Sequence, residues 1–491
     1  MLRKIRITLA TLFFVAITAL FLDFTGALHT WFGWMADIQF LPALLALNVG
    51  VVVALVALTL IFGRLYCSII CPLGVMQDLI AWLGKKAKKN RYTYSNEKRW
   101  LRLIVLVLFT VSLIMGGSVI AQLLAPYSAY GRIASNLLAP LYRWGNNGLA
   151  YLAEHMGSYA FYETEVWIRS GVTFGIALAT LLILGVLAWR GGRTYCNTIC
   201  PVGTLLGYIA RFSWLKPVID TEKCNSCGLC SRNCKASCIN SKEKQIDYTR
   251  CVACMDCIST CKKQGISYKP NRRNTSAKGA CVDTSRRTFL ATTATVAATT
   301  TLKAQEKKVD GGLAAIQDKQ APTRQTHIVP PGALSARHFA KHCTACQLCV
   351  SACPNSVLTP STDLARLMQP EMRYERGYCR PECTQCSEVC PTGAIRPITR
   401  EDKSSTQIGH AVWVKQNCIP LTDGVSCGNC ARHCPVGAIQ MVPSEADNKR
   451  SPHIPVINAE RCIGCGACEH LCPARPFSAI YVEGHERHKE N

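Results

Sequence analysis

Residues 63–74 read GRLYCSIICPLG, and residues 192–203 repeat the pattern as GRTYCNTICPVG. Each copy follows a long apolar stretch and contains two cysteines in a Cys-x3-Cys-Pro motif. Such internal similarity indicates two copies of one structural unit. We therefore expect two related halves that share an approximate two-fold axis.

The first 215 residues contain four apolar stretches long enough to cross the roughly 30 Å core of a bilayer as helices: residues 7–22, 41–62, 103–124 and 171–189. Lys and Arg precede the first stretch and gather between the second and third, whereas residues 27–40 contain neither. The positive-inside rule places both ends of this region in the cytoplasm. The predicted fold is an α-helical membrane domain with four transmembrane helices in two pseudo-symmetric hairpins, arranged as a parallel repeat.

Most of the 30 cysteines lie outside this region, with the spacing Cys-x2-Cys-x2-Cys-x3-Cys that binds iron–sulfur clusters. In two-cluster ferredoxins the first three cysteines of a run bind one cluster, and the fourth, usually followed by Pro, binds the other. Disulfides and structural zinc do not need this crossed cysteine, so they explain the pattern less well. The rule gives six 4Fe–4S clusters, with these ligands: Cys224, Cys227, Cys230 and Cys261; Cys251, Cys254, Cys257 and Cys234; Cys343, Cys346, Cys349 and Cys390; Cys379, Cys383, Cys386 and Cys353; Cys418, Cys427, Cys430 and Cys472; Cys462, Cys465, Cys468 and Cys434.

The first of these modules departs from the pattern, because Lys235 and Lys262 stand where Pro is expected. Cys238 competes with Cys234 as a ligand there, although the x3 spacing favours Cys234. Cys281 lies in a linker and is interpreted as an unpaired thiol.

Residues 285–290 read SRRTFL, a twin-arginine export signature, for which a chance pair of arginines is the alternative. The weakly apolar run at residues 289–302 is too short to span a membrane and is typical of a signal. The predicted order is a membrane domain (1–215), a cytoplasmic di-cluster module (216–270), a linker with the internal signal (271–330) and two periplasmic di-cluster modules (331–400 and 401–491). Each module is expected to have an α+β ferredoxin-like fold.

The cysteines of the paired motifs are not needed for the six clusters and predict a further metal centre. They are Cys67, Cys71, Cys196 and Cys200. Residues four apart share a helix face, so each pair is expected to point one way, and the repeat brings both pairs to one axis. Four thiolates there would hold a small iron–sulfur centre or a soft ion such as copper or zinc. The alternatives are small packing residues or a redox-active dithiol.

Polar residues at the outer membrane edge, His29, Asp37 and Gln39, would accept protons from a quinol or interact with interfacial water. Arg64 and Arg193 are interpreted as positive-inside anchors. The net charge of +24 does not indicate nucleic-acid binding, because much of it flanks apolar helices and no recognition motif accompanies it.

With these motifs, residues 1 to about 270 resemble the NapH-type membrane quinol dehydrogenase subunit of periplasmic nitrate reductase systems. Residues from about 285 onward resemble the exported NapG-type ferredoxin partner, so the chain looks like a fusion of the two. The resemblance implies a protein of the bacterial inner membrane that passes electrons from quinol through its clusters to a periplasmic reductase or cytochrome. The Cys-x3-Cys-Pro repeat also resembles a regulator of nitrous oxide reduction and a copper-reducing oxidase assembly factor. A metal reductase or a maturation factor for a metalloenzyme is therefore the alternative function.

Overall fold

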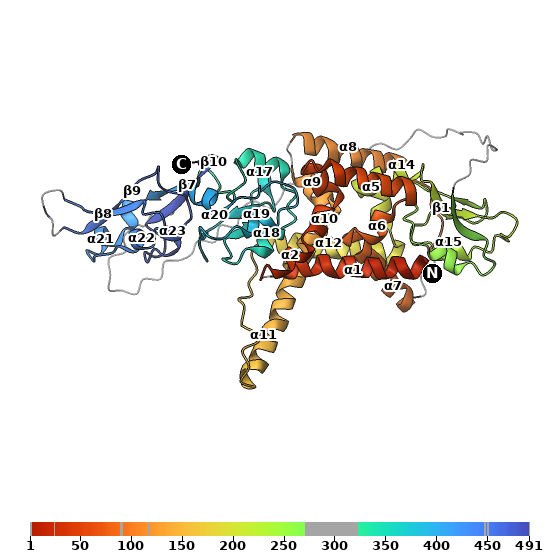
Figure 1. Ribbon diagram of the computed structural model, residues 1–491, viewed down its shortest axis with the longest axis horizontal. Coiled ribbons are helices and arrows are strands. Elements are labelled where there is room, and N and C mark those ends of the chain that lie inside the picture. The colour runs from red at the N-terminus through yellow and green to blue at the C-terminus, as the bar shows by residue number, and fades with distance from the viewer. Residues whose placement is uncertain are drawn as a thin grey trace, which may run out of the picture. The chain divides into compact units, whose positions relative to one another are not determined.

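The computed structural model describes residues 2–23, 25–88, 92–115, 118–270, 323–445, 448 and 451–490 (Figure 1). All of them belong to one unit, which comprises Met1–Asn271 and Lys319–Asn491. The predicted export signal, Cys281 and most of the predicted linker lie outside the described residues.

Helices make up the described part of the chain before residue 215. They are α1 (Leu2–Leu22), α2 (Ala27–Phe32), α3 (Trp34–Asp37), α4 (Phe40–Leu45), α5 (Val49–Phe62), α6 (Leu65–Ile69), α7 (Pro72–Lys88), α8 (Arg99–Met115), α9 (Ser118–Leu124), α10 (Pro126–Ile133), the π-helix η1 (Ala134–Leu138), α11 (Ala139–His155), α12 (Gly171–Gly191), α13 (Thr194–Thr198) and α14 (Pro201–Ala210).

The two sequence copies form corresponding elements. In the first copy an apolar helix, α5, is followed by the short α6 and by α7, and in the second α12 is followed by α13 and α14. Gly63 (φ 72°) and Gly192 (φ 66°) end the apolar helix in each copy. This left-handed backbone favours glycine, which explains why both copies of the motif begin with it.

Two of the predicted transmembrane helices are each divided into two helices in the structure. The stretch 41–62 contains α4 and α5, because the Asn48 side chain caps α5 by accepting from Val51 N at 3.3 Å. The stretch 103–124 extends over α8 and α9. Among the described residues, α1 and α12 are long and apolar enough to cross a membrane, and α5 and α14 are shorter apolar helices.

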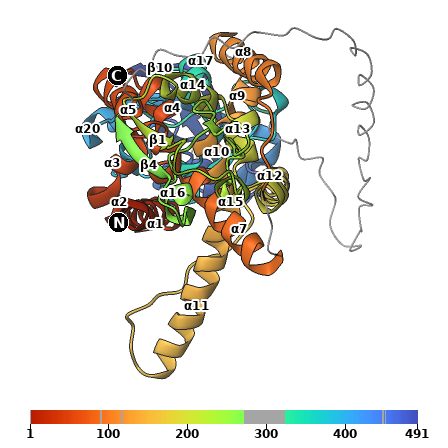
Figure 2. The ribbon, with the colours of Figure 1, turned by 90° about the vertical axis from the view of Figure 1, so that its right-hand side faces the viewer.

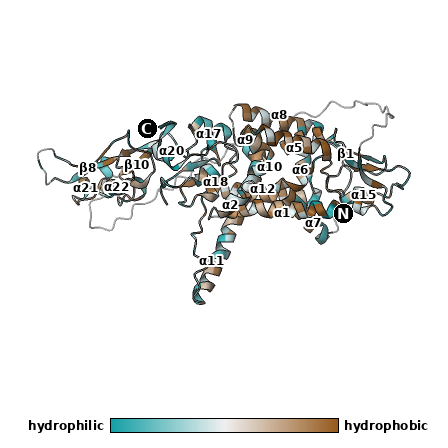
Figure 3. Cartoon of the chain, in the orientation of Figure 1, coloured by the Kyte–Doolittle hydropathy of each residue, from teal (hydrophilic) through white to brown (hydrophobic). Residues whose placement is uncertain are grey.

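Large apolar side chains lie exposed on both long helices. Leu12 and Val15 of α1 and Leu182 and Ile183 of α12 are 52–60% exposed. Figure 3 shows hydrophobic residues over much of α1, α5, α8 and α12. Apolar surface of this extent is typical of contact with a membrane or a partner.

Residues 125–167, which lie between the third and fourth apolar stretches, are largely helical. They contain α10, η1 and α11, and Figure 2 shows α11 pointing away from the other helices. Amphipathic helices do not produce a long apolar run, so the pattern of apolar stretches did not predict them.

The described cysteine-rich regions are built from short helices and two-stranded antiparallel sheets. β1 pairs with β4, β2 with β3, β5 with β6, β7 with β10 and β8 with β9. The elements are β1 (Leu215–Ile219), α15 (Leu229–Asn233), β2 (Ile239–Asn240), β3 (Gln245–Ile246), α16 (Asp256–Thr260), β4 (Ile266–Pro270), α17 (Ala336–His342), α18 (Leu348–Ala352), β5 (Leu358–Pro360), the 3₁₀ turn η2 (Leu364–Arg366), β6 (Pro370–Met372), α19 (Gln385–Glu388), α20 (Arg400–Ser405), β7 (Thr406–Trp413), the 3₁₀ turn η3 (Lys415–Asn417), α21 (Ile419–Thr422), α22 (Asn429–Arg432), β8 (Ile439–Pro443), β9 (His453–Ile457), α23 (Ala467–His470) and β10 (Ile480–Glu490).

The two C-terminal modules are joined by the last strand. β10 pairs with β7, and its Arg487 also forms a bridge with Ser335 of the preceding module. His488 N donates to Leu334 O at 2.8 Å. We call residues 323–490 the outer modules and residues 216–270 the inner module.

Candidate iron–sulfur and paired-cysteine sites

The paired cysteines occupy matching positions in the two copies. Cys67 lies in α6 and Cys196 in α13, whereas Cys71 and Cys200 lie directly before α7 and α14. The prediction that both cysteines of a motif share one helix face is wrong, because α6 and α13 end before the second cysteine. The proline that opens the next helix disfavours a helical conformation in the residue before it, and Cys200 is extended, with ψ 118°.

All four side chains are buried in one hydrophobic core. Burial raises the pKa of the Cys71 thiol, and the nearby thiols of Cys196 and Cys67 raise it further. Burial also raises the pKa of Cys200, with added contributions from the other three thiols. In the described part of the chain, no three His, Cys, Asp or Glu side chains are arranged to hold a single metal ion. Metal binding by the paired cysteines therefore stays a prediction.

Two buried arginines cross between the copies. Arg64 Nη2 donates to Cys196 O at 3.1 Å and lies 3.8 Å from Cys67 Sγ. Arg193 Nη1 donates to Cys67 O at 2.6 Å and lies 3.9 Å from Cys196 Sγ. Both side chains are 0% exposed, so their interpretation as anchors at the membrane edge is wrong. A fixed positive charge near a buried thiol favours the thiolate, the form that binds metals.

The last glycine of each motif makes room for these guanidinium groups. A Cβ atom at Gly74 would lie 2.6 Å from Arg193 Nη1, and one at Gly203 would lie 2.9 Å from Arg64 Nη2. The arginine and the glycine of each motif are therefore part of the same packed site as the cysteines. The arginine and the glycine occur at the same positions in both copies, and this repetition could have marked them as functional. The contact between the two copies was not predictable from the sequence.

An ion-pair network joins the inner module to the first copy. Asp78 in α7 lies 2.6 Å from Arg193 Nε, 2.9 Å from Arg6 Nη1 and 2.8 Å from Lys235 Nζ. Lys235 also lies 3.1 Å from Asp256, and its carbonyl accepts from Arg193 N at 2.8 Å. Burial raises the pKa of Asp78, but Arg193 and Lys235 lower it more, so the carboxyl stays ionised. Lys235, which stands where Pro was expected, thus attaches the inner module to the helices.

A second contact lies next to a predicted cluster ligand. Arg64 Nη1 donates to Thr249 O at 3.3 Å, two residues before Cys251. Asn197 Nδ2 donates to Ala236 O at 3.1 Å. Arg64 thus touches both the paired cysteines and the ligand loop of the inner module.

The inner module brings Cys234 to Cys251, Cys254 and Cys257, as the crossed rule predicts, with one addition. The grouping of Cys261 with Cys224, Cys227 and Cys230 stays a prediction. Cys230 neighbours Cys224 and Cys227, and Cys261 ends α16 beside Cys257. A separate cavity is lined by Cys234, Cys238, Cys251, Cys254 and Cys257.

The outer modules show the same crossed grouping. Cys353, Cys379, Cys383 and Cys386 line one cavity. Cys349 neighbours Cys343, Cys346 and Cys390. Cys430 neighbours Cys418, Cys427 and Cys472, and Cys468 neighbours Cys434, Cys462 and Cys465.

Backbone N–H groups point at several of these sulfurs. Ala438 N donates to Cys434 Sγ at 3.2 Å, and Ala479 N donates to Cys472 Sγ at 3.2 Å. Hydrogen bonds to the sulfurs tune iron–sulfur clusters. Both the grouping of the cysteines and these donors therefore fit 4Fe–4S clusters.

The predicted proton-accepting residues differ in their surroundings. Gln39 is buried and accepts from Tyr66 Oη at 3.1 Å, directly beside the first paired motif. His29 is half-buried, with Nδ1 3.9 Å from Asp23 Oδ2, whereas Asp37 is exposed. Gln39 therefore supports the paired-cysteine region instead of facing interfacial water.

The outer modules contact the helices through α10 and η1. Asn136 Nδ2 donates to Gln347 Oε1 at 2.7 Å, and the hydroxyls of Ser135 and Ser351 lie 2.9 Å apart. A Cβ atom at Gly131 would lie 2.3 Å from Cys346 O. The loop that carries three predicted ligands, residues 343–349, thus packs directly on the helices.

Two protein-family profiles match the chain. The profile of a 4Fe–4S binding domain matches residues 44–91 and 172–219, which contain the two copies of the paired-cysteine motif. The profile of a 4Fe–4S dicluster domain matches residues 342–394 and 425–475 in the outer modules.

Curated relatives cover about a third of the chain. The methylamine utilization ferredoxin-type protein MauM of Methylobacillus flagellatus is 32% identical over 165 residues, which are 33% of this chain and 70% of the relative. The ferredoxin-type protein NapG of Escherichia coli K12 is 33% identical over 178 residues, 33% of this chain and 75% of NapG. The chain belongs to this family of 4Fe–4S ferredoxin-type proteins. The ferredoxin-type protein NapF of the same organism is 28% identical to it over 159 residues, 32% of this chain and 87% of NapF. No solved structure matches this ferredoxin-type chain.

Proposed function

We propose that this ferredoxin-type protein is a membrane-bound relay that passes electrons from the quinol pool through 4Fe–4S clusters to a periplasmic reductase of a nitrate-reductase-like system. The observation that carries the proposal is that cluster-binding regions contact opposite ends of α1. Near its start, Arg3 Nε donates to Asp256 Oδ1 of the inner module at 2.8 Å. Near its end, the ring of Phe21 in α1 lies close to Gly131, and Cys346 O of the outer modules lies close to the same glycine.

The length of α1 suits a membrane crossing. At 1.5 Å per residue, its 21 residues extend about 31 Å, close to the roughly 30 Å hydrocarbon core. The exposed apolar faces of α1 and α12 would contact lipid, and the basic residues near the inner module would be cytoplasmic. On this proposal the chain lies in the bacterial inner membrane, with the inner module in the cytoplasm and the outer modules in the periplasm.

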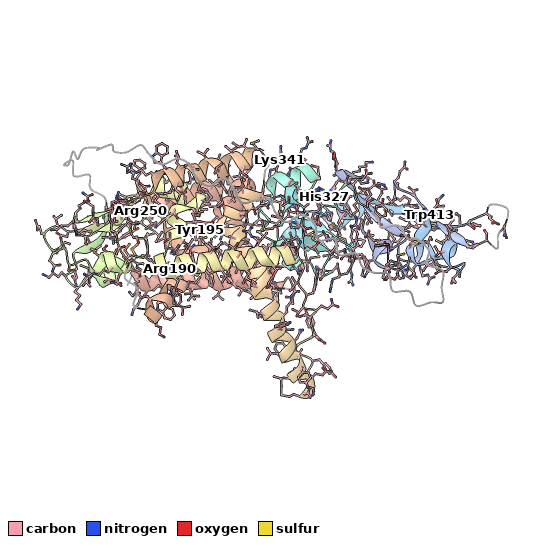
Figure 4. The ribbon with its side chains drawn as sticks, turned by 180° about the vertical axis from the view of Figure 1, so that it is seen from behind. Arg190, Tyr195, Arg250, His327, Lys341 and Trp413 are labelled. Carbon is pink, nitrogen blue, oxygen red and sulfur yellow. The ribbon has the colours of Figure 1, made fainter. Side chains whose placement is uncertain are left out.

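The paired cysteines would supply the step between the two sides. Arg64 contacts them and the ligand loop of the inner module. Toward the outer modules, Tyr195 Oη donates to Leu124 O at 2.9 Å, and the buried Tyr127 lies near Cys346. Figure 4 shows Tyr195 among the helices. A redox group held by the four thiols would shorten the distance that an electron crosses in one transfer.

The outer modules would continue the path toward a soluble partner. Cys379 N donates to Cys465 O at 2.9 Å, which brings ligand loops of the two modules together. The predicted ligand set of Cys418, Cys427, Cys430 and Cys472 includes the half-buried Cys427. Val425 and Leu421, which precede Cys427 in the sequence, are 59% and 45% exposed. Exposed apolar residues next to a cluster would suit a transient redox partner.

The alternative proposal is a metal reductase or a maturation factor for a metalloenzyme. It is favoured by the four buried thiols with two adjacent guanidinium groups, because thiolates select soft ions such as Cu(I). In that case the metal would be cargo, and its release would follow reduction of the clusters.

Reduction by quinol tests the proposal. In membranes held anaerobically, a quinol should reduce the clusters, as followed by EPR, and the double change Cys67→Ser and Cys196→Ser should abolish this reduction. A strong chemical reductant should still produce the cluster signals in the double variant. Cys281→Ser is the matched control, because no motif includes that cysteine. Equal reduction by quinol in the double variant and the control would contradict the proposed route.

Iron content tests the number of clusters. Six four-iron clusters require about 24 irons per chain after anaerobic purification. A content near 8, or zinc in place of iron, would contradict the assignment.

A further inference from the structure

The inner module contains nine cysteines, one more than its two predicted four-iron clusters need. Cys238 is 1% exposed and lines the same cavity as Cys234, Cys251, Cys254 and Cys257. Its Sγ lies 3.5 Å from Cys234 Sγ, and its side chain also neighbours Cys251. Five thiols therefore face a cavity that the crossed rule fills with four.

The outer modules have a different residue at the position that corresponds to Cys238. Residues 390–395 read CPTGAI and residues 434–439 read CPVGAI, whereas residues 234–239 of the inner module read CKASCI. Cys238 thus replaces Ala394 and Ala438, both of which are 1% exposed. Ala438 N donates to Cys434 Sγ, so the position lies against the fourth ligand.

The extra thiol and the fourth ligand lie on either side of the segment that attaches the module. Lys235 O accepts from Arg193 N, and Ala236 O accepts from Asn197 Nδ2. Cys234 precedes this attached segment and Cys238 follows it. A movement of the attached residues, Lys235 and Ala236, would therefore change the positions of the Cys234 and Cys238 thiols by different amounts.

We infer that Cys234 and Cys238 are interchangeable ligands for the fourth iron of the cluster next to Arg64. In the exchange, the Cys238 thiol gives up its proton and forms a bond to iron, while the bond from Cys234 to iron breaks and Cys234 takes up a proton. Charge and electron count do not change, so the exchange needs no oxidant or reductant. The inference rests on cluster binding by the inner module and not on the route proposed for electrons.

Single alanine variants of the full chain, purified anaerobically, test the inference. Loss of a unique ligand exposes one iron and yields a three-iron cluster on mild oxidation, which EPR and Mössbauer spectra distinguish from a four-iron cluster. Cys234→Ala and Cys238→Ala should each keep the four-iron cluster. Cys434→Ala is the matched control, because an alanine stands where the inner module has its extra thiol, and it should yield about one three-iron cluster per chain. A three-iron cluster in Cys234→Ala, or its absence in Cys434→Ala, would overturn the inference.

A gain of function avoids dependence on the folding of the inner module. Adding Ala438→Cys to Cys434→Ala should restore the four-iron cluster in the outer module. If the three-iron signal persists in that double variant, a thiol at this position cannot replace the fourth ligand, and the inference fails.

Discussion

The inner and outer modules attach to the helices through different chemistry. The inner module uses a buried ion-pair network, with Lys235 between Asp78 and Asp256. The outer modules use hydrogen bonds, such as that from Asn136 to Gln347, and an exposed ion pair between Arg376 and Glu165 at 3.9 Å. Removing one partner from a buried ion pair costs about 3–5 kcal/mol, and a neutral hydrogen bond contributes about 0.5–1.5 kcal/mol. The two attachments should therefore respond to different substitutions and by different amounts.

The largest effect is expected for Asp78→Asn. The change leaves Arg193, Arg6 and Lys235 without their shared carboxylate, and should destabilise the attachment of the inner module by about 3–5 kcal/mol. Hydrogen exchange at Arg193 N, which donates to Lys235 O, should become faster, while exchange at residues 343–351 should not change.

The control for this prediction is Asp220→Asn. Its partner Lys223 is 4.0 Å away and both side chains are exposed, so the expected effect is below about 1 kcal/mol. Equal exchange rates in the two variants would mean that charge does not hold the inner module.

An intermediate effect is expected at the outer attachment for Gly131→Ala. The added methyl group would lie 2.3 Å from Cys346 O and 2.9 Å from the Phe21 ring, so the outer modules must shift. Overpacking of this kind costs about 1–3 kcal/mol, which thermal unfolding in detergent would measure. Gly185→Ala in α12 meets no atom within 4 Å and should be neutral or stabilising by up to about 1 kcal/mol. The close approach would be refuted if both variants unfolded at the same temperature.

The smallest effect is expected for Asn136→Ala. It removes the hydrogen bond to Gln347 Oε1 and should cost about 1 kcal/mol, with faster exchange confined to the outer attachment. Asn146→Ala, which removes an exposed hydrogen bond to Tyr162 O, should change stability by less than about 0.5 kcal/mol. A change in exchange at the inner module would show that the two attachments are coupled.

Spacing along the sequence was sufficient to predict which cysteines lie near one another in the outer modules. A run such as Cys343, Cys346 and Cys349 is short, so its geometry depends on local backbone and on the known crossing of the fourth cysteine. The break at Asn48 was harder to predict, because the residues on both sides are apolar and one polar residue in a long run is weak evidence for a helix end.

Contacts between distant segments were not predictable in this way. Arg64 and Asn197 are 133 positions apart, and Arg193 and Asp78 are 115 apart. Basic residues after an apolar helix normally indicate an anchor at the cytoplasmic edge, which is why both arginines were misinterpreted. The departures from the ferredoxin pattern at Lys235 and Cys238 were visible in the sequence, but their meaning required the packing of the module on the helices.

On the proposed function, the inner and outer modules lie on opposite sides of a membrane and are joined by helices that carry the paired cysteines. Protease added to the periplasmic side of intact spheroplasts tests it most directly, with antibodies against tags placed in each module. We expect cleavage in residues 331–491 and protection of residues 216–270. Cleavage should be lost when Arg286 and Arg287 are both changed to Lys. Cleavage in both regions, or accessible outer modules in the double Lys variant, would contradict it.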